Sequence, residues 1–127
     1  MRYFIALFLL LLLSGCDSPI EYQSVPVDTQ AVGNIRVIGD TATMKVRGMN
    51  LLASFSGRYA ETANGFTLSS VARVFPRFSV PLDRDLVFVK AGENKFDCLV
   101  CPDARLEDGR DIGYPIPPYW TVNNSDL

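Results

Sequence analysis

The stretch "NIRVIGDTATMKVR", residues 34–47, decides the fold class. In its second half, Ala42, Met44 and Val46 alternate with polar residues, which is the period of a strand with one buried face. The first half alternates in the same way. The Gly-Asp pair at 39–40 between the halves suits a two-residue type II′ turn, in which glycine adopts a positive φ. The stretch therefore predicts a β-hairpin.

The segments that follow repeat this alternation. Residues 51–59 alternate and lead to Asn64-Gly65, a dipeptide typical of β-turns, after which apolar residues continue to Val74. Gly57, inside the first of these strands, predicts a bulge or the close approach of another backbone. Pro76 predicts the end of the pairing, because proline has no N–H to donate. A second hairpin is therefore expected here.

Three shorter segments complete the pattern. Residues 78–82 alternate but contain Pro81, which predicts an edge or irregular strand. Residues 86–89, "LVFV", predict a strand buried on both faces, and 95–101, "KFDCLVC", predict another strand. Beyond the N-terminal apolar run, no segment has the length and period of an amphipathic helix. We therefore expect an all-β fold, a small sandwich or barrel of about six to eight antiparallel strands, as one β-rich domain over 31–127.

The N-terminus predicts an exported lipoprotein. Residues 1–15 combine one arginine, a short apolar run and small residues, which is the pattern of a cleaved signal peptide; the run is about half of the ~20 residues that span a bilayer. Leu13-Ser14-Gly15-Cys16 resembles a bacterial lipobox, which implies removal of 1–15 and lipid attachment at Cys16. The alternative is an ordinary secretory signal followed by an unrelated cysteine.

The residues after the lipobox suggest where the protein resides. Asp17 resembles the signal that retains some lipoproteins in the inner membrane. We therefore expect a protein of the bacterial cell envelope that faces the periplasm, on the inner membrane in preference to the outer. The following "DSPIEYQSVPVDTQ" contains two prolines and no sustained period, so residues 16–30 are predicted to be a lipid-anchored flexible tether.

Composition excludes several classes of function. The chain of 127 residues carries a net charge of −2 and no histidine, which removes the usual catalytic triads and the commonest neutral metal ligand. A serine with a lysine base stays formally open, but no spacing indicates such a pair. Basic residues are not clustered as nucleic-acid binding requires. We expect no enzymatic activity, no cofactor or metal, and no nucleic-acid partner.

Cys98 and Cys101 have the spacing of a metal or redox motif. A zinc site would need a second pair of ligands, and a thioredoxin-like centre would need a helix N-terminus; the sequence predicts neither. In an oxidising periplasm the pair is expected to form a local disulfide. An uninterrupted strand through both residues would prevent this bond, because it would direct the side chains to opposite faces.

An acidic loop follows this pair. Four carboxylates lie within nine residues and could in principle bind Ca²⁺, but their order does not match an EF-hand, and two arginines lie among them. We expect a solvated turn with salt bridges. The acids are Asp103, Glu107, Asp108 and Asp111, and the arginines are Arg105 and Arg110.

The C-terminal "YPIPPYWTV" combines prolines with the aromatic residues Tyr114, Tyr119 and Trp120. Proline-rich segments favour extended geometry. The segment is expected to pack its aromatic side chains on the domain. The alternative is that the three form a recognition surface for a partner or a glycan.

One stretch has a family resemblance. "FSGRYAETANGFTLSSVARVFP", residues 55–76, resembles the central part of META domains, which are small β-rich domains of bacterial lipoproteins. The chain lacks the cysteines that this family often carries, with Met49-Asn50 and Phe75-Pro76 in the corresponding places. The "SGRY" within the stretch is also similar to membrane-bound lysozyme inhibitors, which are β-barrel lipoproteins.

The anchor, the tether and the compact domain together predict a function class. We expect a lipid-anchored envelope lipoprotein whose non-enzymatic β-domain binds a protein partner or assists an envelope assembly. The alternative is an inhibitor or exclusion lipoprotein, either similar to lysozyme inhibitors or encoded by a prophage.

Overall fold

The computed structural model describes residues 18–26, 31–48, 51–112 and 115–122, most of which lie in strands. Within them, no helix has the length and hydropathy that a bilayer span requires. The elements are β1 (Ile20–Ser24), β2 (Val32–Ile38), β3 (Thr41–Arg47), β4 (Leu52–Thr62), β5 (Gly65–Val74), β6 (Ser79–Pro81), β7 (Leu86–Gly92), β8 (Lys95–Asp97), the 3₁₀ turn η1 (Cys101–Asp103) and β9 (Tyr119–Val122).

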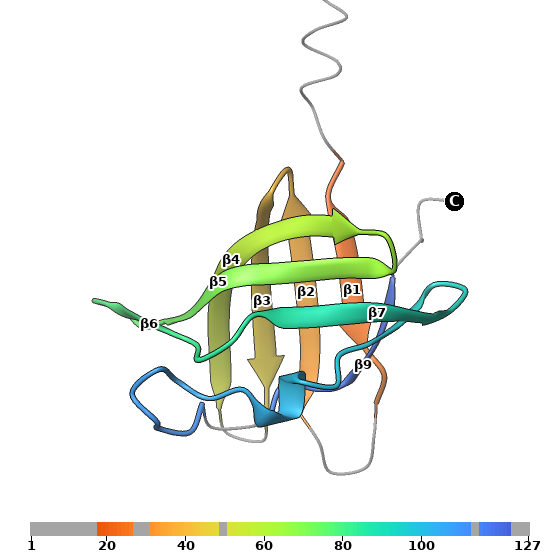
Figure 1. Cartoon of the computed structure of the whole chain (residues 1–127). Coiled ribbons are helices and arrows are strands. Elements are labelled where there is room, and N and C mark those ends of the chain that lie inside the picture. Colours follow the sequence, from red (N-terminus) through yellow and green to blue (C-terminus); the bar gives the residue numbers. More distant parts are fainter. Residues whose placement is uncertain (1–17, 27–30, 49–50, 113–114, 123–127) are drawn as a thin grey trace, which may run out of the picture.

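Eight of these strands close into an antiparallel barrel (Figure 1). The hydrogen-bonded order is β4-β3-β2-β1-β9-β8-β7-β5, and β5 pairs back onto β4 to complete the circle. The short strand β6 adds to β5 outside this circle. The predicted all-β fold is therefore confirmed, and of the two predicted architectures the chain adopts the barrel. Closure leaves the eight strands without an open edge between them.

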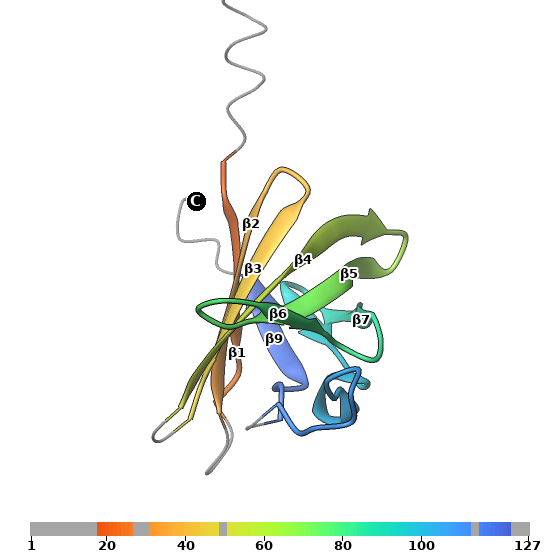
Figure 2. The ribbon, with the colours of Figure 1, turned by 90° about the vertical axis from the view of Figure 1, so that its left-hand side faces the viewer.

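The barrel closes because β4 turns a corner. Its first part continues the layer formed by β1, β2 and β3, and its second part crosses toward β5 (Figure 2). The β4–β5 register shifts between Ser56 and Arg58, which is a bulge, as predicted at Gly57. A Cβ at Gly57 would lie 2.8 Å from Val71 Cγ2 and 3.0 Å from the carbonyl oxygen of Ser69, so glycine permits the close approach of β5.

The predicted turns and strand ends are also confirmed. β2 and β3 pair over their full lengths around Gly39, which adopts φ +63°. The second predicted hairpin, β4 and β5, pairs Thr62 with Gly65 at its turn. β5 ends at Val74, two residues before Pro76, and β6, which contains Pro81, pairs with β5 alone among the described strands.

The predicted tether over 16–30 is wrong for residues 20–24. This segment is β1, which pairs with β2 on one side and β9 on the other. Tyr22 is only 4% exposed and lies in the core, while Ser24 is buried and accepts a hydrogen bond from the backbone N–H of Gly33 at 2.7 Å. Two hydrogen-bonded neighbours hold the strand, and its inward face adds Ile20 and Tyr22 to the core. The barrel therefore begins at Ile20.

An aromatic cluster fills the barrel. Phe66 stacks on Phe88 at 4.4 Å between ring centroids, and Trp120 meets Phe88 edge to face at 5.9 Å. Tyr22 and Tyr59 close the cluster at the end where β1 begins, with their hydroxyls 3.1 Å apart. Burial raises the pKa of Tyr22. These contacts join strands from all sides of the barrel into one core.

Two details of the predicted strands are wrong. Residues 86–89 are not buried on both faces: Leu86 and Phe88 are fully buried, but Val87 and Val89 are exposed, because β7 is part of a barrel wall with an outer surface. The strand predicted over 95–101 ends at Asp97. The chain turns after this residue, with the backbone N–H of Cys101 donating to the carbonyl oxygen of Cys98.

This turn joins Cys98 and Cys101 in a disulfide, with their Cα atoms 5.3 Å apart. Both residues are fully buried. The backbone N–H of Cys98 donates to the carbonyl oxygen of Pro118, so the bonded turn is also fixed to the segment that leads into β9.

Candidate functional site

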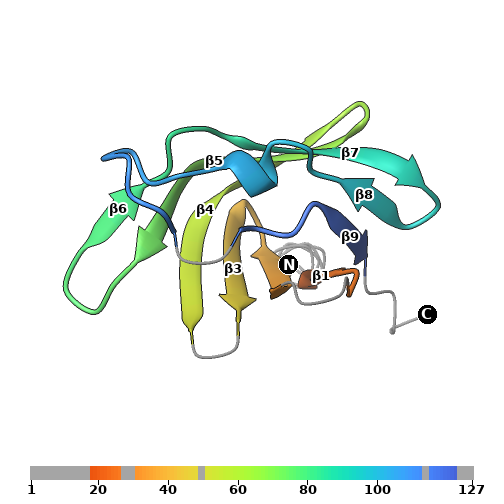
Figure 3. The ribbon, with the colours of Figure 1, turned by 90° about the horizontal axis from the view of Figure 1, so that it is seen from below.

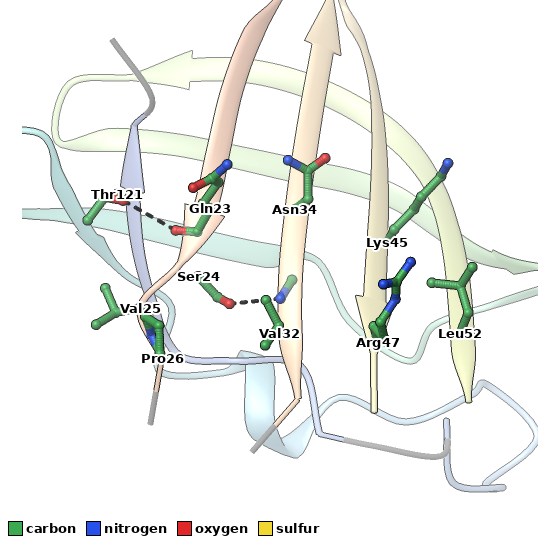
Figure 4. Close-up of a pocket in the computed structure, with 11 residues that line it drawn as sticks. Gln23, Ser24, Val25, Pro26, Val32, Asn34, Lys45, Arg47, Leu52 and Thr121 are labelled. Atoms are coloured by element: carbon green, nitrogen blue, oxygen red, sulfur yellow. Dashed lines mark hydrogen bonds between the residues drawn. The ribbon is translucent and has the colours of Figure 1, made fainter. Parts of the chain in front are cut away.

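The candidate site is a groove of about 670 Å³ on the outer face of the barrel, which we call the sheet-face groove (Figure 4). It crosses the five neighbouring strands from β9 to β4 near the ends of β1 and β3. The residues that line it are Gln23, Ser24, Val25, Pro26, Val32, Gly33, Asn34, Lys45, Arg47, Leu52 and Thr121.

One row of the groove is polar. Thr121, Gln23, Asn34 and Lys45 are successive cross-strand partners on β9, β1, β2 and β3. Directly paired residues in an antiparallel sheet direct their side chains to the same face, with Cβ atoms about 4.5–5.5 Å apart. The row therefore presents a hydroxyl, two amides and an ammonium group in line.

The other row is apolar around one charge. Arg47 of β3 pairs with Val32 of β2 on one side and with Leu52 of β4 on the other. Both apolar side chains are outward and about half exposed, at 54% and 51%. Figure 4 shows the Arg47 side chain between them. Arg47 itself is exposed, so its guanidinium is accessible to an anion beside two apolar side chains.

The two cations of the groove lie close enough together to bind one anion. Lys45 and Arg47 lie two residues apart on the same face of β3, so their Cα atoms are about 7 Å apart. Neither forms an ion pair with another described residue. A guanidinium can hold a carboxylate by two parallel hydrogen bonds, and a nearby ammonium group can hold a second one.

Charge is distributed unevenly along the chain around this site. Residues 41–82 contain five basic residues and a single acidic one, Glu61, which gives this part a charge of +4. Because the whole chain carries −2, the remaining residues carry −6. The part of the barrel from β3 to β6 is therefore positively charged on a protein that is acidic overall, and such a region attracts anionic partners.

The hydroxyl groups of the groove are directed to backbone atoms. The only hydroxyl nucleophiles along it are Ser24 and Thr121, among the described residues. Ser24 is buried and accepts a backbone hydrogen bond, and Thr121 Oγ1 is directed to the carbonyl oxygen of Gln23 at 3.5 Å. In the described part of the chain, no three Cys, Asp or Glu side chains gather as metal ligands would. The arrangement is suited to binding.

The two described aromatic residues of the C-terminal segment, Tyr119 and Trp120, lie on opposite faces of β9. Trp120 is fully buried, and its indole N–H donates to the carbonyl oxygen of Pro117 at 2.6 Å, as expected for packing on the domain; the alternative place of Trp120 on a partner surface is wrong. Strand alternation in β9 directs Trp120 inward and Tyr119 outward, where Tyr119 is 46% exposed. Tyr114, and likewise Cys16 and Asp17, lie outside the described residues.

The acidic loop contains salt bridges. Asp108 pairs with Arg110 at 2.8 Å, and Asp111 pairs with Arg105. A hydrogen bond from the backbone N–H of Arg110, together with its guanidinium, holds the pKa of Asp108 below its usual value. The arginines thus neutralise carboxylates that a cation would otherwise contact.

Comparison with known proteins supplies no evidence about the function of this site. No family model matches the chain, no curated protein matches it, and no solved structure matches its fold.

Sequence reasoning missed the groove, although its signals are present. The alternation in 41–47 assigns Lys45 and Arg47 to a polar face without indicating that this face is a binding surface. Val32 and Leu52 are apolar residues at outward positions, which departs from the alternation of β2 and β4. The absence of acidic residues from 41–60 is the second signal.

Proposed function

We propose that the protein is a lipid-anchored lipoprotein of the bacterial cell envelope, and that its barrel binds an acidic segment of a protein partner in the sheet-face groove without catalysing a reaction. The observation that carries the proposal is the position of Arg47. Its guanidinium lies between Val32 and Leu52, next to Lys45, and has no carboxylate partner among the described residues. A segment with carboxylates and apolar side chains complements this surface.

The shape of the surface favours a protein segment. The groove is open and extends across several strands, with a polar row beside an apolar row, so an extended chain can place carboxylates near Lys45 and Arg47 and apolar side chains near Leu52. A polyanion such as nucleic acid would meet the net negative charge of the remaining barrel, which opposes its binding.

A binding role without catalysis agrees with the chemistry of the chain. Histidine is absent from the sequence, and the two hydroxyls of the groove are directed to backbone atoms. The proposal therefore includes no cofactor and no metal.

The anchor is proposed from the sequence. Leu13-Ser14-Gly15-Cys16 supports lipid attachment at Cys16, and Asp17 supports retention in the inner membrane, with the barrel facing the periplasm. Two or three acyl chains attach a protein stably, since each buried methylene contributes about 0.8 kcal/mol.

Reversing the two charges of the groove tests the binding proposal. The variant Lys45→Glu/Arg47→Glu is expected to reduce capture of the partner at least about tenfold, because acidic groups would then face acidic groups. The measurement is crosslinking of the full lipoprotein in native membranes, separated into inner and outer fractions, followed by quantitative mass spectrometry of the captured proteins.

The matched control is Arg58→Glu/Lys90→Glu. It changes the net charge by the same amount on β4 and β7, outside the groove, where both basic residues are exposed. Support requires a captured protein that the groove variant loses and the control retains. Equal capture by the two variants would overturn the groove as the binding site, and capture of the same proteins in the outer-membrane fraction would overturn the proposed location.

Removing the proposed lipid-carrying thiol tests the anchor. Cys16→Ser is expected to abolish labelling by a fatty-acid analogue and to release the protein from the membrane or leave it unprocessed. Cys98→Ser/Cys101→Ser serves as the control, because it removes the disulfide thiols and leaves the lipobox intact. Membrane attachment and labelling that survive Cys16→Ser would contradict the anchor.

A further inference from the structure

A projecting hairpin belongs to the positively charged part of the barrel. β5 and β6 continue past the barrel wall, and we call their outer end with the turn between them, Arg73–Ser79, the β5–β6 tip (Figures 1 and 3). The backbone N–H of Phe75 donates to the carbonyl oxygen of Phe78 at 2.8 Å and closes the turn. A convex element of this kind fits into a concave surface.

The side chains of the tip are held in place by one another. Phe75 and Phe78 stack with ring centroids 4.7 Å apart and an interplanar angle of 22°. The guanidinium of Arg73 lies 4.7 Å from the centroid of Phe75 and donates to the carbonyl oxygen of Ile112 at 2.7 Å. The tip is therefore preorganised, which lowers the entropy lost on binding.

The outer surface of the tip has the composition of a binding hot spot. Phe78 is 58% exposed, Val74 is also exposed, and Arg77 lies beside them at the turn. Arg77 makes no ion pair with any described residue. Aromatic and arginine side chains dominate the energetics of protein interfaces. A role in partner binding would explain why this aromatic pair lies at the surface of the protein and not in its core.

The tip continues the face that carries the groove. Lys45 of β3 pairs with Ser54 of β4, Ser54 pairs with Val74 of β5, and Val74 pairs with Ser79 of β6. This outward row extends from the groove to the tip without interruption. A partner bound in the groove is therefore next to the tip.

We propose that the β5–β6 tip docks into an acidic cleft, partly lined by apolar side chains, on the protein partner that the groove binds. The charge of the segment specifies this chemistry: no acidic residue occurs between Glu61 and Asp83, and Arg73 and Arg77 are the charged residues of the tip. The inference rests on the proposed function because it requires a protein partner. Arg77 meets carboxylates of the cleft, and Phe78 fills its apolar part.

The variant Arg77→Lys tests whether the side chain at position 77 contacts a carboxylate of the partner. A water-soluble carbodiimide joins a lysine amine to a carboxylate in direct contact and leaves arginine unmodified. The full lipoprotein with Arg77→Lys is treated in native membranes, and amide products at position 77 are mapped by mass spectrometry. We expect a product with an Asp or Glu of another protein, absent from the wild type. Adding Phe78→Ser should reduce its yield at least about tenfold, as loss of a hot-spot residue does.

Arg58→Lys provides the matched control, because Arg58 is an exposed arginine of β4 that makes no ion pair with a described residue and lies outside the tip. Absence of an amide product at position 77, while groove-dependent capture persists, overturns the tip inference and leaves the proposed function standing. Absence of both overturns the two together. A product at position 77 that Phe78→Ser leaves unchanged, or that Arg58→Lys matches at position 58, shows random contact and also overturns the inference.

Discussion

Trp120→Ala is expected to destabilise the barrel by about 3–5 kcal/mol, the usual range for deleting a buried tryptophan side chain. The indole is fully buried, contacts Phe88 edge to face, and donates its N–H to Pro117. Alanine would leave a cavity against Gly33 and an unpaired carbonyl acceptor. Domains of this size have about 5–15 kcal/mol of stability, so a large part of it would be lost.

The measurement is urea unfolding followed by circular dichroism, since Trp120 is the single tryptophan and its fluorescence is lost with the substitution. Tyr119→Ala is the control from the same strand. Tyr119 is 46% exposed, so its loss should change stability by less than about 1 kcal/mol. Equal losses in the two variants would show that β9 does not direct Trp120 into the core.

Gly65→Ala is expected to destabilise the protein by about 3 kcal/mol, at the upper end of what overpacking usually causes. A Cβ at this position would lie 2.0 Å from the carbonyl oxygen of Phe88 and 3.2 Å from Val89 Cα. Both atoms belong to the backbone of β7 and cannot rotate away. The β5–β7 ladder, which begins at the Gly65–Val89 pair, would have to separate at one of the seams that close the barrel.

Gly92→Ala is the matched control, because Gly92 also lies in a strand but a Cβ there would contact only the Lys95 side chain, at 3.8 Å. Its effect should stay within about 0.5 kcal/mol. Urea midpoints of the two variants provide the comparison. A Gly65→Ala midpoint as high as that of Gly92→Ala would contradict the close β5–β7 approach.

Most of the fold could be predicted because its information is local. The β2–β3 hairpin combines strict alternation with a glycine that adopts φ +63°, and both features appear within 14 residues of sequence. Gly57 likewise predicted the bulge from its position inside a strand pattern. Alternation does not specify which strands meet at long range, so the pairing of β1 with β9, separated by about a hundred residues, could not be derived.

The elements that were predicted wrongly depend on such distant partners. β1 is short, lies between two prolines, and becomes a strand because β2 and β9 supply hydrogen bonds on both sides. In the same way, the sequence places Trp120 in a proline-rich segment that suits either packing or recognition. Its burial follows from the space that Gly33 of β2 leaves for it, where a Cβ would be 2.5 Å from the indole.

The candidate site was the least predictable part, because it is a property of neighbouring surfaces. Val32, Arg47 and Leu52 belong to three strands and meet only through the registers of two ladders. A cationic or apolar residue at an outward position of one strand does not indicate which residues of the neighbouring strands lie beside it. The part that could be read in advance was the exclusion of histidine-based chemistry.

With the proposed anchor at Cys16, the incorporation of β1 into the barrel limits how far the barrel can extend from the membrane. With the barrel beginning at Ile20, only three residues separate it from Cys16, a span of at most about 14 Å. A tether that ran to residue 30 would have reached about 50 Å. If Cys16 carries the proposed lipid anchor, the barrel stays within a thin layer above the bilayer, in which two membrane proteins meet by lateral diffusion at high effective concentration. A partner of modest affinity would then be bound for most of the time, provided that its own acidic segment lies within that layer.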